Sequence, residues 1–171
     1  MKYNYVTIYN KNTEFLQAHP LLKRVVQIGN LALTALFPIA YALLLVNSFF
    51  IKELEPKETA FILFFPLLAL LTVSVLRLLV ERPRPYEENG ANITPLFQKK
   101  SVGNSFPSRH LACAAVIAWT VASQFFGAGI LLFACALLLG YTRFAAGWHY
   151  PTDIVAGLGI GTVIGIFTLL I

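Results

Sequence analysis

The chain consists of long apolar runs separated by short polar segments. Five of these runs contain, or nearly contain, the roughly 20 apolar residues that a helix needs to cross a bilayer. They cover residues 25–50, 58–80, 108–125, 128–146 and 152–171. Because lipid cannot hydrogen-bond exposed backbone groups, we expect these runs to be helices rather than strands. The pattern therefore predicts an all-α, polytopic membrane bundle of about five transmembrane helices.

Residues 1–24 are too polar to span a membrane, although they carry several aromatic and aliphatic side chains. Tyr5, Ile8, Tyr9 and Phe15, mixed with Lys and Asn, are typical of a segment that lies in the membrane interface. A disordered tail is the alternative interpretation. We expect two parts: an N-terminal interfacial segment over residues 1–24 and one transmembrane domain over 25–171.

The composition excludes a soluble globular domain. Hydrophobic residues make up 57% of the chain and charged residues 12%, whereas soluble domains carry about 25% charged residues. The net charge of +5 is modest, and the basic residues gather at span ends and in one long loop. This placement suits membrane lipids and an anionic lipid substrate, and we expect no nucleic-acid partner. Oligomeric state is left open.

Three polar islands interrupt the apolar pattern, at residues 77–85, 107–110 and 142–153. The loop over 81–107 is long and rich in Pro, Asn, Lys and Arg, and long connections of this kind are usually functional. If five spans alternate in direction, the second and fourth end on the membrane face where the third and fifth begin. The topology therefore predicts that all three islands meet on one side of the membrane.

The third island combines a histidine with a carboxylate and an arginine. Asp153 follows His149 by four residues, so at the start of a helix it can reach back toward the imidazole. A carboxylate on one ring nitrogen fixes the tautomer and leaves the other nitrogen free to attack. Arg143, at the end of the preceding span, can hold two phosphate oxygens with its planar guanidinium.

The other two islands supply a second histidine and more arginines. Ser108 suits a helix N-cap, and His110, just inside that helix, could protonate a leaving oxygen. Arg77 and Arg84 could stabilise a phosphoryl group in transfer.

Each residue also has a simpler interpretation. Arg82 and Arg84 could be interfacial anchors, and His110 a capping or interfacial histidine. Asp153 could be only an N-terminal helix charge. Trp148 and Tyr150 are typical of an aromatic belt at the membrane boundary. The predicted convergence of all these residues on one face favours the chemical interpretation.

Taken together, the three islands resemble the signature of the type 2 phosphatidic acid phosphatase (PAP2) superfamily. That signature reads Lys-x6-Arg-Pro, Pro-Ser-Gly-His and Ser-Arg-x5-His-x3-Asp. This chain has Arg77-x6-Arg84-Pro85, Pro107-Ser108-Arg109-His110 and Thr142-Arg143-x5-His149-x3-Asp153, in the family's order.

The resemblance implies a role for each matching position. His149 would be the nucleophile that forms a phosphohistidine, Asp153 its orienting carboxylate and His110 the general acid. Phosphate oxygens would be bound by four residues, Arg77, Arg84, Ser108 and Arg143. The resemblance implies no metal and no cofactor.

Three positions depart from the family pattern. Arg77 replaces lysine and Thr142 replaces serine, which preserve the charge and the hydroxyl. Arg109 replaces a glycine that lets backbone amides approach phosphate closely, so its side chain either narrows the pocket or points outward. Our hypothesis is that Arg109 contacts a second phosphate and favours a diphosphate substrate.

Short five-span relatives resemble bacterial undecaprenyl diphosphate phosphatases, which implies hydrolysis of a polyprenyl diphosphate to the monophosphate. A phosphatidic acid or phosphatidylglycerophosphate phosphatase is the alternative within the same chemistry. A non-catalytic lipid-binding or transport protein is the alternative from another class, although such a protein has no need of both His110 and His149.

Two signals bear on membrane sidedness, and they favour opposite faces. Lys23, Arg24, Arg82, Arg84, Lys99 and Lys100 all fall on the active-site face, so the positive-inside rule favours the cytoplasm. Some of them are also proposed phosphate ligands, and bacterial relatives act outside. We expect an integral protein of the bacterial plasma membrane with its active site on the outer face.

The last apolar run carries Gly157, Gly161 and Gly165 at four-residue spacing. Such a stripe allows a neighbouring helix backbone to approach closely. We interpret it as an internal packing surface, with a dimer face as the alternative.

Overall fold

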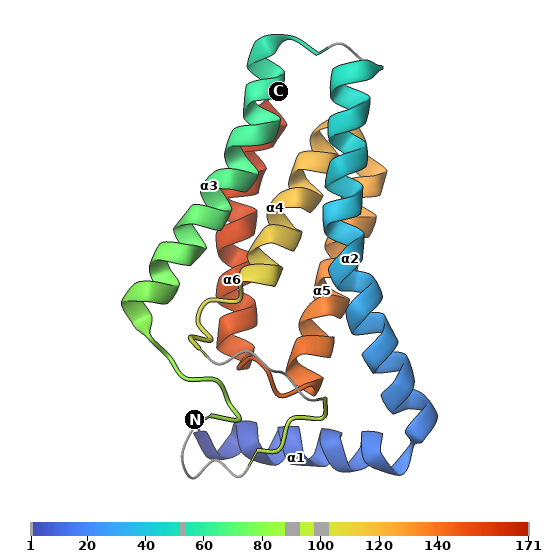
Figure 1. Cartoon of the computed structure of the whole chain (residues 1–171), viewed down its shortest axis with the longest axis vertical. Coiled ribbons are helices and arrows are strands. Elements are labelled where there is room, and N and C mark those ends of the chain that lie inside the picture. The colour runs from blue at the N-terminus through green and yellow to red at the C-terminus, as the bar shows by residue number, and fades with distance from the viewer. Residues whose placement is uncertain (1, 52–53, 88–92, 98–102, 171) are drawn as a thin grey trace.

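The computed structural model describes residues 2–51, 54–87, 93–97 and 103–170. Within these ranges every regular element is a helix, which confirms the predicted fold class (Figure 1). The elements in chain order are α1 (Lys2–Ala18), α2 (Pro20–Phe50), α3 (Pro56–Val80), α4 (Arg109–Gln124), α5 (Phe126–Ala145), α6 (Pro151–Gly165) and the 3-10 helix η1 (Ile166–Leu170).

The hydrophobic pattern located the spans to within a few residues. The largest difference is in α2, which begins at Pro20 rather than at residue 25. Proline is well suited to a first helical turn, where its missing N–H is not needed. Four segments are long and apolar enough to cross a membrane, namely α2, α3, α5 and α6 continued by η1.

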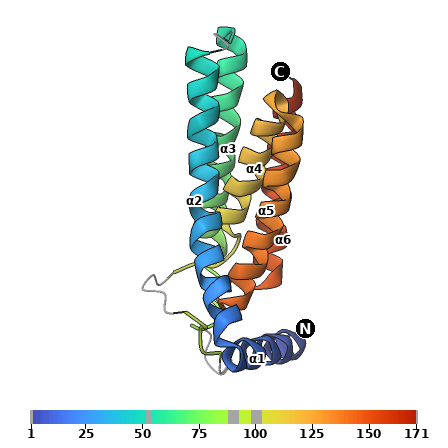
Figure 2. The same ribbon diagram turned by 90° about the vertical axis from the view of Figure 1, so that its right-hand side faces the viewer.

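Helix α4 is the exception among the predicted spans. Its 16 residues give a length of about 24 Å, short of the roughly 30 Å hydrocarbon core. It lies at the centre of the bundle, with α2 and α3 on one side and α5 and α6 on the other (Figure 2). Because its neighbours shield it from lipid, α4 does not have to match the bilayer thickness itself.

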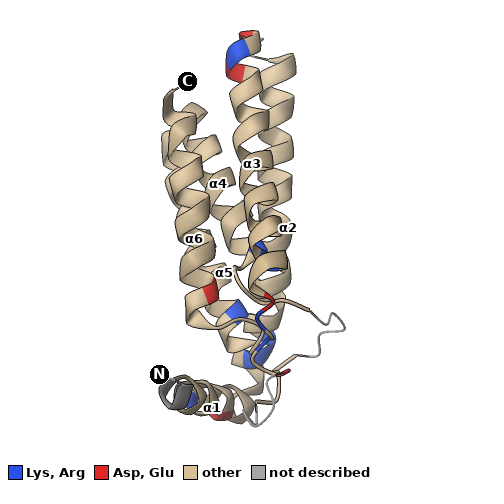
Figure 3. Ribbon diagram, turned by 90° about the vertical axis from the view of Figure 1, so that its left-hand side faces the viewer, with Lys and Arg blue, Asp and Glu red and all other residues tan. Residues whose placement is uncertain are grey.

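The outward faces of the long helices are apolar. Leu43, Leu79 and Leu131 are each more than half exposed, as expected where lipid rather than water is the solvent. Lys, Arg, Asp and Glu gather toward the lower half of the bundle and around the α2–α3 turn (Figure 3). The apolar exterior and the charged ends confirm an integral membrane protein.

The glycine stripe of α6 packs against α4. A Cβ at Gly157 would meet the backbone oxygen of Ser108 at 2.5 Å, and one at Gly161 would meet the backbone oxygen of Ala112. A Cβ at Gly165 would lie 2.9 Å from the Cβ of Trp119. The three glycines therefore let the two helix backbones touch, which confirms the internal packing surface.

Helix α1 lies across the end of the bundle, nearly perpendicular to the other helices (Figures 1 and 2). Within this helix, the side chains of Tyr9 and Leu16 are buried, whereas those of Ile8 and Phe15 are about half exposed. The helix packs on α2 and α5. Residues 2–18 thus form a helix that packs on the end of the bundle, and its position in the membrane interface stays a prediction.

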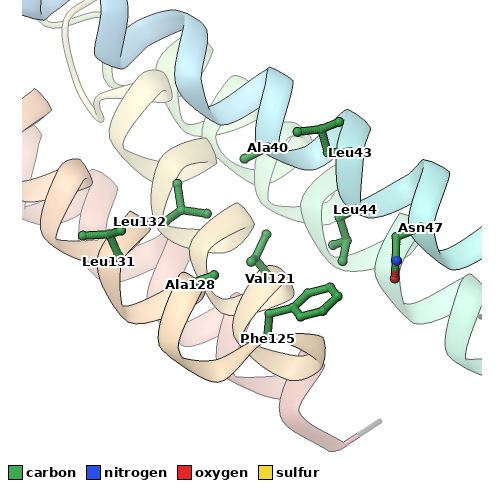
Figure 4. A pocket seen from close by; sticks show the side chains of 9 residues that line it. All are labelled: Ala40, Leu43, Leu44, Asn47, Val121, Phe125, Ala128, Leu131 and Leu132. Carbon is green, nitrogen blue, oxygen red and sulfur yellow. The ribbon is translucent and has the colours of Figure 1, made fainter.

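At the opposite end of the bundle, an apolar groove of about 420 Å³ opens between α2 and the α4–α5 pair (Figure 4). Leu43, Leu44, Val121 and Phe125 contribute to its walls, and Asn47 is its one polar side chain. Because the lining carries no charge, this groove cannot bind a phosphate.

We predict that Gly161→Ala destabilises the protein, because the new Cβ must displace the backbone of α4 at Ala112. Overpacking of this kind costs about 1–3 kcal/mol, so the melting temperature in detergent should fall. Gly159→Ala is the matched control, since no atom lies within 4 Å of its Cβ position. Equal melting temperatures for the two variants would contradict the packing described here.

Candidate active site

The three polar islands meet at one end of the bundle, as the topology predicts. The ends of α3 and α5 and the starts of α4 and α6 all lie there, above α1 (Figure 1). One backbone hydrogen bond links two islands directly, from the amide of Ser108 to the carbonyl of Asp153 at 3.0 Å. A second joins the first island to the segment just before the second, from the amide of Ser105 to the carbonyl of Arg82 at 2.7 Å.

His149 and Asp153 form a buried pair. His149 lies in the α5–α6 connection and Asp153 in the first turn of α6, and both side chains are almost inaccessible to solvent. The His149 Nδ1 is 3.5 Å from the Asp153 Oδ2. That oxygen also accepts the backbone N–H of Tyr150 at 2.9 Å. The carboxylate therefore faces Nδ1, as the four-residue spacing predicts.

The second carboxylate oxygen binds an arginine that the sequence did not single out. Arg82 Nη1 donates to Asp153 Oδ1 at 2.9 Å and to the Thr152 hydroxyl at 2.8 Å. The Arg82 guanidinium also lies over the ring of Tyr150, 3.9 Å from its centroid. Arg82 is therefore part of the site, and the interpretation as an interfacial anchor is wrong.

The start of α4 carries Ser108, Arg109 and His110. Ser108 is fully buried and occupies the N-cap position, as predicted. Arg109 and His110 are exposed in the first helical turn. The contact of Arg109 with a second phosphate stays a prediction.

Arg77 and Arg84 hold the loop between α3 and α4. Arg77 donates through Nη1 to the carbonyls of Pro107 at 3.1 Å and Ser105 at 3.3 Å, and through Nη2 to that of Asn104. Arg84 donates to the carbonyl of Gly103 at 3.1 Å. Both guanidinium groups therefore bind loop carbonyls, and their role in phosphate binding stays a prediction.

Arg84 also reaches the island that contains His149. Its Nη1 donates to the carbonyl of Trp148 at 3.4 Å, and the side chain is only 6% exposed. Arg143, near the start of the same island, is also buried, and its guanidinium carbon lies 5.1 Å from the Trp148 ring centroid. Its Nη2 donates to the Thr34 hydroxyl of α2 at 2.6 Å. Two buried cations thus flank the residue that precedes His149.

Trp148 and Tyr150 are not belt residues at the membrane boundary. Both are more than 90% buried. The Trp148 indole N–H donates to the carbonyl of Phe97 at 3.2 Å, so the ring is hydrogen-bonded to the long loop between α3 and α4. The aromatic-belt interpretation was wrong because hydropathy does not distinguish an aromatic residue facing headgroups from one packed beneath a loop.

Helix α1 supplies two tyrosines to the underside of the site. The Tyr9 hydroxyl donates to the carbonyl of Thr94 at 2.7 Å. Its ring fills the space beside Gly147, where φ is +72° and a Cβ would lie 2.7 Å from the Tyr9 oxygen. Burial raises the pKa of Tyr9 and of Tyr5 above the usual value, so both side chains stay neutral.

No group of three or more His, Cys, Asp or Glu residues that could hold a metal ion occurs in the described part of the chain. Lys99 and Lys100, which contribute to the basic loop, lie outside the described residues.

Comparison with known proteins places the chain in a family. A model of the PAP2 superfamily matches residues 58–171. The lipid A 1-phosphatase of Rhizobium johnstonii is 32% identical over 122 residues, which cover 66% of this chain and 47% of that protein. The lipid A 1-phosphatase of Rhizobium etli is 37% identical over 111 residues, covering 58% and 43%. The chain thus spans less than half the length of these relatives.

Two solved structures have the same fold. Aquifex aeolicus LpxE superposes with a TM-score of 0.68 at 30% identity, over 90% of this chain and 88% of that one. A PAP2-type phosphatidylglycerolphosphate phosphatase from Bacillus subtilis gives a TM-score of 0.56 at 20% identity, over 98% and 93%, and shows the fold alone. With the family model covering all three islands, this chain belongs to the PAP2 superfamily.

Proposed function

We propose that the protein is an integral-membrane lipid phosphatase, independent of metal ions, that acts through a phosphohistidine on His149. The observation that carries this proposal is the buried His149–Asp153 pair, held between arginines at one end of a membrane bundle. A histidine whose Nδ1 faces a carboxylate has its tautomer fixed, and a buried arginine can stabilise the charge of a transferring phosphoryl group.

The proposed reaction has two steps. In the first, His149 Nε2 attacks phosphorus, the bond from phosphorus to the leaving oxygen breaks, and His110 gives that oxygen a proton. In the second, water attacks the phosphohistidine and gives a proton back to His110, the bond from phosphorus to Nε2 breaks, and inorganic phosphate is released with both imidazoles restored. Ser108, Arg84, Arg143 and Arg77 are proposed to bind the phosphate oxygens, as the family resemblance implies.

We predict that His149→Ala lowers phosphate release by about 10⁴-fold or more, because the nucleophile is lost. Release from a lipid A-type 1-phosphate and from undecaprenyl diphosphate should be measured in detergent, with and without a chelator. The wild type should retain activity in chelator and carry an acid-labile phosphate label on His149. His19→Ala is the matched control, since His19 is exposed and its Nδ1 lies 2.8 Å from the carbonyl oxygen of Phe15.

The opposite results would be equally informative. A His149→Ala variant that keeps its activity would remove the proposed nucleophile. Folded wild-type protein that releases phosphate from neither lipid would favour the non-catalytic lipid-binding or transport alternative.

Two substrate classes are supported by different observations. The lipid A 1-phosphatases among the relatives support a phosphate on a lipid-linked sugar. The exposed Arg109 beside His110 supports a diphosphate, of which undecaprenyl diphosphate is the candidate from the sequence. An arginine at that position can contact the phosphate that is not transferred.

We predict that Arg109→Gly lowers activity on the diphosphate lipid relative to a monophosphate lipid by about fivefold. An exposed ion pair contributes up to about 1 kcal/mol, which corresponds to that factor. Arg109→Lys keeps the charge and is the control that should keep most of the preference. An unchanged ratio of the two activities in Arg109→Gly would contradict a role for this side chain in substrate choice.

We further propose that the active-site end faces the outer side of a bacterial plasma membrane. The positive-inside rule favours the opposite orientation, but its count of basic residues includes Arg82 and Arg84. Both instead bind groups within the site, a carboxylate and two carbonyls. Without these two residues, the difference in positive charge between the two ends is smaller.

We predict that a cysteine at position 11 reacts with a membrane-impermeant maleimide in intact cells, whereas one at position 57 does not. Lys11→Cys lies on α1 at the active-site end, and Lys57→Cys lies at the start of α3 at the other end. Cys113 and Cys135 should be replaced by alanine first. Labelling of position 57 alone would place the active site in the cytoplasm.

A further inference from the structure

Arg82 contacts the first turn of α6 at several points. Its guanidinium binds the hydroxyl of Thr152 and the carboxylate of Asp153 and lies over the ring of Tyr150. Three different kinds of contact therefore fix one side chain. Each of them involves the short segment that follows His149.

The backbone at Arg82 is fixed as well. The Arg82 carbonyl accepts the amide of the buried Ser105, and the Ser105 hydroxyl donates to the carbonyl of Pro83 at 3.0 Å. Pro83 restricts its own backbone to one φ region. The guanidinium thus extends from a segment that has little freedom to move.

The carboxylate of Asp153 divides its two oxygens between different partners. Oδ1 binds Arg82, whereas Oδ2 accepts the Tyr150 amide and faces His149. A fully buried carboxylate is disfavoured unless it is paired and hydrogen-bonded. In the described residues, Arg82 is the arginine that forms an ion pair with it. If Arg82 were absent, the carboxylate could rotate about its Cβ–Cγ bond and turn Oδ2 away from Nδ1.

Helix α1 supports this arrangement from below. The ring of Tyr5 is 5.1 Å from the ring of Tyr150, which is the ring that Arg82 covers. Its hydroxyl is buried and has no hydrogen-bond partner among the described residues. The ring contact of Tyr5 with Tyr150, and of Tyr150 with Arg82, therefore connects α1 to the carboxylate of Asp153.

We propose that Arg82 is a positioning residue, which orients the Asp153 carboxylate toward His149 without touching the substrate. This inference rests on the proposed function of His149 and Asp153 and adds a residue at a position that the first family motif leaves unspecified. Arg82 precedes the motif arginine Arg84 by two residues, and its side chain contacts α6 and the N-cap residue of α6.

The test compares Arg82→Ala and Arg82→Lys with wild type in the lipid phosphate assay. We expect Arg82→Ala to lower kcat on the order of 10–100-fold, as removing the outer partner of an oriented ligand does. KM should stay within about twofold because no substrate contact is lost. Added guanidinium ion should restore part of the kcat of Arg82→Ala, and Arg82→Lys should keep an intermediate kcat. Arg24→Ala, an exposed site on α2, is the control that should respond to neither.

Two outcomes would overturn the proposal. One is a kcat of Arg82→Ala within twofold of wild type. The other is a loss of kcat that neither lysine nor guanidinium ion restores and that accompanies a fall in melting temperature, since that pattern indicates a purely structural role.

A second measurement separates this inference from the proposed function. Binding of vanadate, an analogue of the phosphoryl group in transfer, requires an oriented histidine but no turnover. Vanadate should bind more weakly to Arg82→Ala than to Arg82→Lys or wild type. Inactive wild-type protein would contradict the proposed function, whereas equal vanadate affinity in all three proteins would contradict the inference about Arg82.

Discussion

The buried carboxylate of Asp153 determines how the active-site end of this bundle is assembled. Its side chain is fully shielded from solvent, and a charge in that position must be paired and hydrogen-bonded. Arg82 and the amide of Tyr150 supply those bonds. The backbone carbonyl of Asp153 itself accepts the amide of Ser108. Asp153 therefore holds three segments together: the one that follows α3, the start of α4 and the one that precedes α6.

The glycines of α6 make this arrangement possible. Ser108 can reach Asp153 only if the start of α4 lies directly on α6, and the absence of a side chain at Gly157 allows that contact at Ser108 itself. Gly161 continues the close approach one turn further on. The packing that buries α4 in the centre of the bundle therefore also sets the positions of Ser108 and His110 relative to Asp153. Stability and site geometry depend on the same helix crossing.

The sequence predicted the spans and the His149–Asp153 pair because both depend on local spacing. Hydropathy locates helices of about 20 residues, and a carboxylate in the first helical turn can reach back to a residue four positions earlier in the connection. The partner of Asp153 was not predictable in the same way. Several arginines compete for one buried carboxylate, and the path of the loop after α3 decides which reaches it. Similarly, the amphipathic pattern of residues 1–24 indicates a surface helix but not that Tyr5 and Tyr9 pack beneath the site.

The change from lysine to arginine at position 77 has a structural explanation. Arg77 binds the carbonyls of Asn104, Ser105 and Pro107, which follow one another along the loop that leads to Ser108. A planar guanidinium offers five N–H donors in a fixed fork, whereas an ammonium offers three from one point. Arginine can therefore bind several carbonyls while its charge remains near the residues proposed to bind phosphate. Arg84 combines the same two properties, since its contacts to Gly103 and Trp148 use two of its donors. In this bundle the cations expected to hold the anion are also the groups that fold the loop around it.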